Sequence, residues 1–329
     1  MQRAHDTAIE KPAVAILFIL LGMLCISIND MLIKYLSGQY PLHQMILVRS
    51  AIGICFSLVI LQFEGGIAML RTNQIGLHAL RGLCIVAANM TFFAALAVIP
   101  LADATALFFV APLFITVLAI PFLGEQVGLR RLGAVVVGFL GVLIMLRPGA
   151  DSANFTSERF VLLLPILAAF AYACMQILTR RLGVASKASA MAIYIQATFI
   201  VVSLAFWAIA GDGRFAEDAE SQSLVFLLRA WTWPTEEDWL LFLVLGAVSA
   251  VIGYSLSQAY RSANAATVAP FEYAALPLSI FWGWMVFGHL PDLWVMCGIV
   301  MIAASGVYVF LREGTKKREV ASGRPVRRV

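Results

Sequence analysis

The sequence predicts an all-α membrane protein in which ten transmembrane helices form two inverted five-helix repeats. Of its 329 residues, 61% are hydrophobic and only 13% are charged, and the mean hydropathy is +0.90. A soluble core of this length cannot hide that much apolar surface. The lipid bilayer is therefore the expected environment of most of the chain.

An internal repeat is the second observation behind this prediction. The stretch Leu101–Pro148 has the same order of features as Ala263–Gly314: small residues around an Ala-Thr pair, a mid-helix proline, a Gly-polar turn and spaced glycines. A weaker match links Asn29–Ser37 with Met175–Gly183. With one constant shift, the following residues fall on one another: Gly133 on Gly298, Gly141 on Gly306 and Arg147 on Arg312. Duplicated membrane bundles with a cavity between the halves are typical of transporters.

Apolar runs long enough to cross a bilayer provide the third observation. A spanning helix needs ~20 mostly apolar residues. By that criterion the spans are Ala13–Tyr35, Gln44–Gln62, Ile75–Ile99, Leu101–Leu123, Leu129–Leu146, Phe160–Thr179, Ala188–Ala210, Trp239–Tyr260, Ala265–Phe287 and Leu290–Leu311. Five spans per half is an odd number, so the second half starts on the opposite side of the membrane and the repeat is inverted.

The distribution of cations predicts that both termini are cytoplasmic, by the positive-inside rule. The chain then divides into a cytoplasmic N-terminus (1–12), a first repeat (13–147), a periplasmic loop (148–159), a second repeat (160–311) and a basic cytoplasmic tail (312–329), which is expected to be disordered near anionic lipid. The long outer loop at 211–238 carries Trp231 and Trp233. Its apolar part is too short to span, so it is expected to rest on the outer interface or to act as a lid.

Four charged side chains inside the spans are functional candidates, because ionisable groups are expensive in a bilayer. Glu272 lies about seven residues, or ~10 Å, into its span. Pro270 and Pro277 flank it and are expected to interrupt that helix. A carboxylate there can bind a cationic group, carry a proton, or hold a neighbouring helix.

Asp30 and Lys34 are one helical turn apart, and Arg49 lies at a similar depth in the next span. Either Asp30 pairs with Arg49 to pin two helices while Lys34 snorkels outward, or Asp30 and Arg49 form the rim of a substrate site. Arg81 is expected to snorkel to the headgroups.

Uncharged polar and aromatic side chains complete the candidate site. Such polar groups commonly join helices, but those in several spans can instead face a cavity and contact a substrate. Aromatic side chains there would suit a flat, partly aromatic solute. The predicted substrate-binding or coupling residues are Asp30, Arg49, Asn89, Phe108, Gln176, Tyr254, Phe271, Glu272 and Tyr273. All five cysteines lie in apolar runs without a CxxC pair, so they are expected to be buried, and no metal site or cofactor is predicted.

The start Asp103-Ala104-Thr105-Ala106, the mid-span Pro112, the Gly124-Glu125 turn and the Gly-rich helix that ends in Arg-Pro resemble the EamA-type repeat of the drug/metabolite transporter superfamily. The resemblance covers both halves and implies an inner-membrane transporter of ten helices that moves a small organic metabolite. The second half has Gly288-His289 where the first half has Gly124-Glu125. Any role that the resemblance implies for the acidic residue of this turn therefore applies only to Glu125. Pairing with Arg130 or Arg131 is its simplest role.

These observations predict a secondary carrier with a small-molecule substrate and no nucleic-acid partner. The aromatic side chains favour a planar heteroaromatic solute such as riboflavin, with amino acids or S-adenosylmethionine as alternatives. Proton coupling and a homodimer both remain open. A membrane-embedded enzyme or a passive scaffold is the competing class, but the chain has no HExxH, GxSxG or GxxxxGK[ST] motif.

Overall fold

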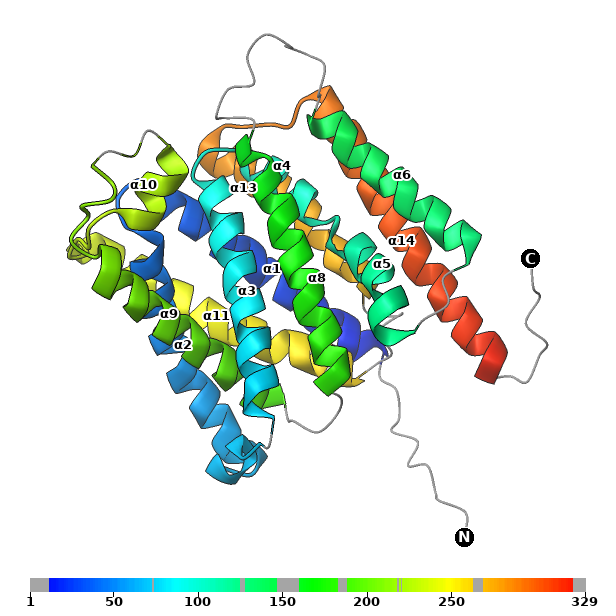
Figure 1. Cartoon of the computed structure of the whole chain (residues 1–329), viewed down its shortest axis with the longest axis horizontal. Helices are drawn as coiled ribbons and strands as arrows, with labels where there is room; N and C mark the ends of the chain where they lie inside the picture. The colour runs from blue at the N-terminus through cyan, green and yellow to red at the C-terminus, as the bar shows by residue number, and fades with distance from the viewer. Residues whose placement is uncertain are drawn as a thin grey trace.

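The computed structural model describes residues 12–72, 74–124, 128–146, 160–182, 188–217, 219, 221–262 and 269–321, and every regular element within these ranges is helical (Figure 1). The longer helices are α1 (Pro12–Leu36), α2 (Leu42–Glu64), α3 (Ile75–Leu96), α6 (Leu129–Leu146), α8 (Leu163–Leu182), α9 (Ala188–Ala210), α11 (Glu236–Ser262) and α14 (Leu293–Ala321). The shorter ones are η1 (Ile67–Leu70), α4 (Leu101–Phe108), α5 (Ala111–Leu123), α10 (Gln222–Leu228), η3 (Ala269–Ala274) and α13 (Ala275–Phe287).

Six helical stretches in the described ranges are long and apolar enough to cross a membrane. They are Ala13–Leu36, Leu42–Phe63, Ile75–Leu96, Leu101–Phe122, Ala192–Ala210 and Glu236–Leu256. Four shorter apolar helices accompany them, at Leu132–Leu146, Leu163–Thr179, Phe271–Phe287 and Leu293–Tyr308. The all-helical membrane fold is thus confirmed, and each apolar helix lies within or across one of the predicted spans.

Two of the predicted spans are broken in the middle. The fourth is α4 followed by α5, with Pro112 in the first turn of α5. A proline there has no N–H for the carbonyl of Phe108, so the ladder of hydrogen bonds stops at that point. The ninth is the 3₁₀ turn η3 followed by α13. Both α5 and α13 end at a glycine in the left-handed conformation, Gly124 (φ 67°) and Gly288 (φ 68°), which is the usual helix-ending residue.

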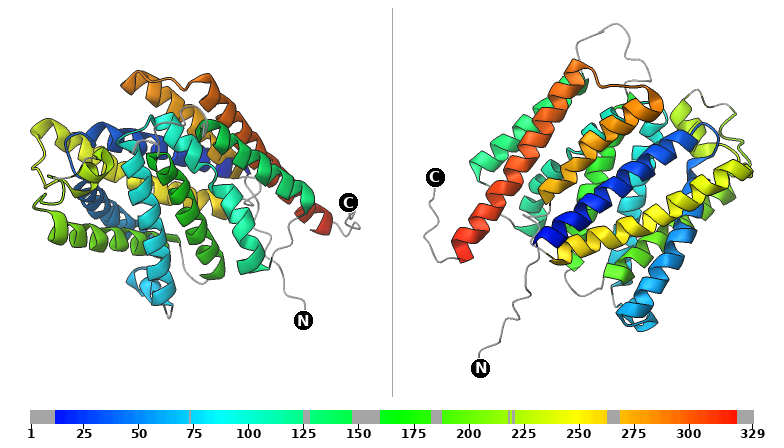
Figure 2. Two further views of the ribbon diagram at one scale, coloured as in Figure 1. Left: turned by 45° about the horizontal axis from the view of Figure 1, so that its top comes forward. Right: turned by 180° about the vertical axis from the view of Figure 1, so that it is seen from behind.

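The helices pack in pairs that join the two halves of the chain. α1 lies along α11 and α3 along α8, while α2 contacts α9, α6 contacts α14 and α4 contacts α13. Figure 2 shows α1 and α11 side by side from behind, and α6 and α14 as a pair at one edge of the bundle. Every one of these pairs brings together helices from opposite halves of the sequence.

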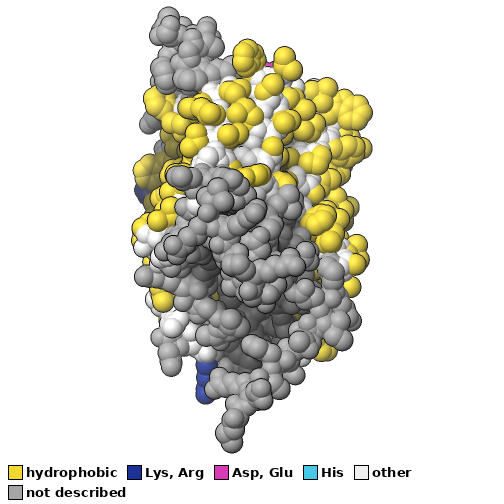
Figure 3. Space-filling model, turned by 90° about the vertical axis from the view of Figure 1, so that its right-hand side faces the viewer, with side chains coloured by type: hydrophobic (Ala, Val, Ile, Leu, Met, Phe, Trp, Pro, Cys, Tyr) yellow, Lys and Arg dark blue, Asp and Glu magenta, His cyan; other side chains and the backbone are white. Residues whose placement is uncertain are grey.

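The α6–α14 pair approaches closely at two glycines. A Cβ on Gly141 would lie 3.1 Å from the carbonyl oxygen of Gly298, and a Cβ on Gly298 would lie 2.9 Å from that of Gly141. Small residues of this kind let membrane helices pack tightly. The outer side of α6 exposes Val136, Leu140 and Leu143, and hydrophobic side chains cover much of the described surface on this side of the molecule (Figure 3).

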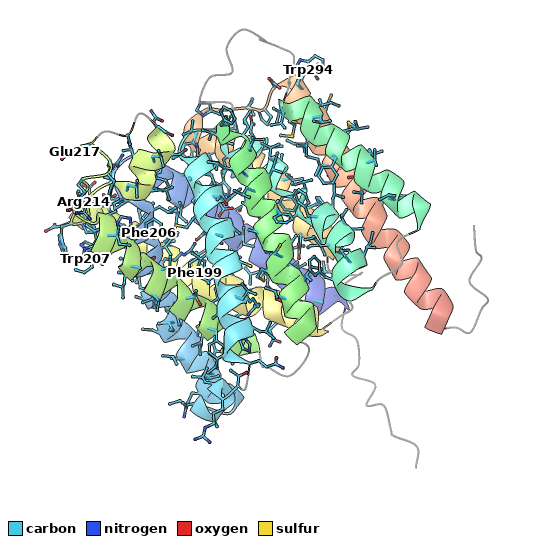
Figure 4. The ribbon with its side chains drawn as sticks, in the orientation of Figure 1. Phe199, Phe206, Trp207, Arg214, Glu217 and Trp294 are labelled. Carbon is cyan, nitrogen blue, oxygen red and sulfur yellow. The ribbon has the colours of Figure 1, made fainter. Side chains whose placement is uncertain are left out.

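The segment between α9 and α11 docks on the bundle through α10. Phe226 of α10 is 1% exposed, so the segment does more than rest on the membrane interface. Tyr40 Oη donates to Asp238 Oδ2 at 2.6 Å, and Gln44 exchanges hydrogen bonds with the backbone of Thr232. Phe206 and Trp207 lie at the end of α9 nearest this segment (Figure 4). Three more hydrogen bonds join this segment to the same end of the bundle. Ser223 Oγ donates to the carbonyl oxygen of Ala94, Arg229 Nη1 donates to that of Gly38, and His43 Nδ1 bonds to that of Leu227.

Burial raises the pKa of the Tyr40 hydroxyl above its ordinary value, and the hydrogen bond to Asp238 raises it further. The neutral phenol is therefore the form that the fold favours, and it is the form that can donate to the carboxylate.

Two expectations about the ends and the cysteines are corrected. α14 continues ten residues beyond the predicted end at Leu311. Among the cysteines only Cys25 is buried, whereas Cys55 and Cys297 are exposed on apolar helices. A thiol is apolar enough for such a surface. Residues 1–11, 147–159 and 322–329 and Glu125 lie outside the described residues, as do the side chains of Arg130 and Arg131, so the roles predicted for them stay predictions.

Candidate functional site

Asp30 and Arg49 lie close together, and an amide connects them. Arg49 Nη1 donates to Asn29 Oδ1 at 3.1 Å, and Asn29 Nδ2 donates to Asp30 Oδ1 at 2.9 Å. Asn29 and Arg49 are 4% and 5% exposed, whereas Asp30 is only half-buried. The two charges predicted to meet across α1 and α2 are therefore linked through Asn29, and the accessible group at the end of this chain is the carboxylate.

Two phenylalanines enclose the guanidinium group of Arg49. Its Cζ lies 5.8 Å from the ring centroid of Phe93 on α3 and 5.4 Å from that of Phe199 on α9, which Figure 4 marks beside α3. Cation–π contacts of this kind partly replace the hydration that a buried guanidinium loses. Sequence reasoning missed both rings. The only signal in the sequence was Arg49 itself, because a cation buried in an apolar span requires partners, but it does not identify which residues they are.

Lys34 neither snorkels outward nor pairs with Asp30. Its Nζ donates to the carbonyl oxygens of Leu96 at 2.6 Å and Ile99 at 2.7 Å, and it lies 5.4 Å from the ring centroid of Phe287. The last carbonyls of a helix lack intrahelical partners and carry partial negative charge. The ammonium group is thus satisfied at the C-terminal end of α3, where it ties α1 to the junction between α3 and α4.

The prediction that Arg81 reaches the headgroups is also wrong. Arg81 is 7% exposed, and its Nε donates to Thr179 Oγ1 on α8 at 2.8 Å. Because α3 packs along α8, the side chain finds a partner inside the bundle and does not need to reach the headgroups.

A row of aromatic rings leads away from the Arg49 site. The centroid of Phe93 is 5.5 Å from that of Phe92, which is 5.2 Å from Phe108. Phe108 in turn lies 5.5 Å from Tyr172 on α8. From Phe108 the row continues through Phe109, at 6.4 Å, to Tyr273, at 5.1 Å from Phe109. These spacings are those of directly packed aromatic pairs.

Glu272 lies at the far end of this row. Glu272 lies within electrostatic range of the hydroxyl groups of both Tyr172 and Tyr273. Gln176 Nε2 donates to Tyr172 Oη at 2.7 Å. Glu272 and Gln176 are half-buried, whereas Tyr273 is 7% exposed. The interruption that the flanking prolines predicted is present, and Glu272 lies on its 3₁₀ turn η3, which contacts α1 and α14.

The predicted site residues therefore fall into two connected groups and three separate positions. The Asp30–Arg49 group and the group of Phe108, Gln176, Glu272 and Tyr273 are joined by the aromatic row. Asn89 bonds within its own helix, Tyr254 is 38% exposed with its ring edge against Phe18, and Phe271 packs with Ala15, Ile19 and Ala259. Tyr172 was missed, although it carries the signal that selected Tyr254 and Tyr273, namely a hydroxyl group within an apolar run.

Comparisons with known proteins indicate the family of this chain. A model of the EamA-like transporter family matches residues 13–147. A riboflavin transporter of Vibrio cholerae is 30% identical over 313 residues, which is 94% of this chain and 97% of that protein. An S-adenosylmethionine uptake transporter of Rickettsia bellii is 27% identical over 94% of this chain and 97% of that protein. A solved crystal structure shares the fold, with a TM-score of 0.59 at 17% identity over 93% of this chain and 99% of that chain.

A bundle of apolar helices that holds half-buried carboxylates and packed aromatic rings fits a carrier for a small solute. The chain belongs to the EamA-like transporter family, and it is a multi-pass membrane transporter.

Proposed function

We propose that this transporter is a secondary carrier for a planar heteroaromatic metabolite of the riboflavin type, working by alternating access in the bacterial inner membrane. The observation that carries the proposal is the row of aromatic rings between Asp30 and Glu272. Flat rings stack on such faces, and the half-buried carboxylates at its two ends supply polar contacts. Relatives that are named riboflavin transporters support the same class of solute.

S-Adenosylmethionine is the second candidate substrate. Two interior carboxylates, Asp30 and Glu272, suit a solute that carries a positive charge, and several relatives are named S-adenosylmethionine uptake transporters. The two candidates differ in charge, because riboflavin is neutral at pH 7 and the sulfonium of S-adenosylmethionine is a fixed cation. Mutation of the carboxylates to amides therefore has a larger expected effect on the cationic solute.

Uptake by the purified protein in proteoliposomes tests the proposal. We expect uptake of labelled riboflavin that saturates, that excess unlabelled riboflavin inhibits, and that an aliphatic amino acid does not inhibit. Inhibition by S-adenosylmethionine alone, without riboflavin uptake, would favour the second candidate. Growth of a riboflavin auxotroph that expresses the protein at low external riboflavin provides the matching cellular assay. An amino acid as the only transported solute would refute both candidates.

The proposed architecture has ten spans in two inverted five-helix repeats. Its support is the pattern of helix contacts. The proposed counterparts in the two repeats are α1 and α8, α2 and α9, α3 and α11, α4–α5 and η3–α13, and α6 and α14. When each helix is replaced by its counterpart, the α1–α11 contact becomes the α8–α3 contact. The α2–α9, α4–α13 and α6–α14 contacts map onto themselves. A pseudo-two-fold axis between inverted repeats requires this correspondence.

Both termini are proposed to be cytoplasmic. Reporter fusions after Arg131, Arg181 and Arg312 are expected to give a cytoplasmic signal, and fusions at Asp151 and Glu220 a periplasmic one. A cytoplasmic signal at Glu220 would contradict the arrangement of five spans plus five.

Proton coupling is proposed to run through Glu272. It is half-buried, it lies on the interrupted ninth span, and its charge reaches both Tyr172 and Tyr273. An ionisable group in such a position commonly serves a coupling ion in a carrier.

A further inference from the structure

We propose that Asp30 selects the substrate by accepting a hydrogen bond from a ring N–H group, and that Asn29 and Arg49 position Asp30 without touching the substrate. This inference rests on the proposed function and specifies the part of the ring that the site recognises. The chemical group is the imide edge of a heteroaromatic ring, in which an N–H lies between two carbonyl groups. The isoalloxazine ring of riboflavin has such an edge at N3.

The hydrogen bonds around Asp30 leave one side of the carboxylate for a ligand. Asn29 Nδ2 holds Oδ1 at 2.9 Å, and within the described part of the chain Oδ2 accepts no hydrogen bond. Asp30 is half-buried, while Asn29 and Arg49 behind it are at least 95% buried. A carboxylate only accepts hydrogen bonds, so the ligand group opposite Oδ2 must be a donor.

Arg49 is sealed away from any substrate. Rings of Phe93 and Phe199 lie near its guanidinium group, and its Nη1 donates to Asn29 Oδ1 at 3.1 Å. That bond fixes the amide of Asn29 with its oxygen toward the cation, and hence its Nδ2 toward Asp30. Arg49 thus sets the orientation of Asn29, and Asn29 holds the Oδ1 side of the carboxylate.

The aromatic row gives the ring of the substrate a place near this edge. Phe93 contacts both the guanidinium group of Arg49 and the ring of Phe92, and Phe92 contacts Phe108. Asp30 is linked to this row through Asn29 and Arg49, so the proposal places a flat ring along the row with its edge toward Asp30. Stacking selects for flatness and the carboxylate selects for a donor at the edge, so the two features together define an imide-bearing heteroaromatic.

Comparison of riboflavin with 3-methylriboflavin tests the proposal, because the methyl group removes only the N3–H donor. In the wild-type protein we expect the methylated compound to bind about ten- to hundredfold more weakly, as for a lost hydrogen bond to a charged group. The Asp30→Asn variant has the same side-chain volume. Its amide oxygen would meet Asn29 Nδ2, and its NH₂ group would face the substrate as a donor. We therefore expect Asp30→Asn to bind riboflavin more weakly and to bind the two compounds about equally.

Steric exclusion of the methyl group gives a different result. Because Asp30→Asn keeps the shape of the site, steric rejection would leave the ratio of the two affinities unchanged in that variant, and this outcome overturns the proposal. Equal binding of both compounds by the wild-type protein also overturns it. Wild-type protein that binds and transports neither compound refutes the proposed function itself, and with it this inference.

The positioning role is tested with variants that keep the carboxylate. Asn29→Ala and Arg49→Lys are expected to lower the preference for riboflavin over the methylated compound. A purely structural role would reduce binding of both compounds by the same factor and would contradict the positioning role. Thr91→Val on α3 is the matched control, because Thr91 Oγ1 bonds only within its own helix, to Ala87 and Ala88. If Asp30→Asn does not insert into the membrane, the double variant Asp30→Asn, Arg49→Gln supplies the same comparison, because it also replaces the carboxylate by an amide and leaves no buried cation without its partner.

Discussion

Gly306 and Tyr273 offer a direct test of how the site is packed. A Cβ on Gly306 of α14 would overlap the hydroxyl oxygen of Tyr273 and would lie 3.1 Å from its Cε2. The ring is 7% exposed, and Phe109 packs against it at 5.1 Å, so it has little room to retreat. The Gly306→Ala substitution must therefore push the ring into its neighbours.

The expected loss of stability follows from this overlap. Overpacking by one methyl group in a tight core costs about 1–3 kcal/mol. Replacement of glycine by alanine also changes helix propensity, and Gly133→Ala on α6 is a matched control for that effect, since no heavy atom lies within 4 Å of its added Cβ. We expect Gly306→Ala to be less stable than Gly133→Ala by about 1–3 kcal/mol, because the propensity change cancels in the comparison.

The measurement is thermal unfolding of the two variants in the same detergent, together with riboflavin binding. Combination of Gly306→Ala with Tyr273→Phe should recover part of the loss, because it removes the overlapping oxygen. That oxygen has no hydrogen-bond partner in the described part of the chain, so Tyr273→Phe alone should not destabilise. Equal stability of Gly306→Ala and Gly133→Ala would refute the reasoning.

Three further outcomes follow from the charged and phenolic groups. If Glu272 carries the coupling proton, Glu272→Gln should abolish accumulation against a gradient and spare exchange at equal pH; loss of expression and exchange together would indicate a structural role instead. If Asp30 and Arg49 depend on each other, the double variant Asp30→Asn, Arg49→Gln should express better than either single variant, since each single change strands a buried charge; additive losses would contradict that dependence. The raised pKa of Tyr40 means that its stabilising effect is fully present below the unfolded-state pKa of about 10 and is lost as the pH rises through the higher folded-state value. Unfolding temperatures of wild type and Tyr40→Phe should therefore differ at pH 8 and converge at higher pH, and a difference that does not change with pH would contradict this assignment.

The sequence predicted the elements of the fold well, because hydropathy and proline placement act locally. Transfer of an apolar run into lipid depends on the composition of that run alone, so the apolar helices were recognisable. Pro270 and Pro277 were likewise expected to interrupt the ninth span, and the 3₁₀ turn η3 precedes α13 there. The break at Pro112 in the fourth span was not predicted, although the same rule applies to it.

The partners inside the bundle depended on information that a single sequence does not carry. Arg81 was expected to reach the headgroups, and so was Lys34 in one of the two accounts of Asp30 and Arg49, as each side chain could on an isolated helix. In the bundle, Lys34 meets the free carbonyls at the end of α3, and Arg81 meets Thr179 across the α3–α8 contact. The rings around Arg49 come from α3 and α9, so their position depends on how three helices are rotated relative to one another.

The docking of the α10 segment has a consequence for the biogenesis of the protein. The turn between α1 and α2 bonds to residues that are 184 to 198 positions later in the chain. At a synthesis rate of ~5–20 residues per second, Tyr40 and Gln44 leave the ribosome ~10–40 s before Thr232 and Asp238 exist. During that interval the first hairpin must remain in the membrane with its polar turn hydrated. A truncated first half would therefore insert with this end of the bundle unfinished, and it would depend on later synthesis of the second half to complete it.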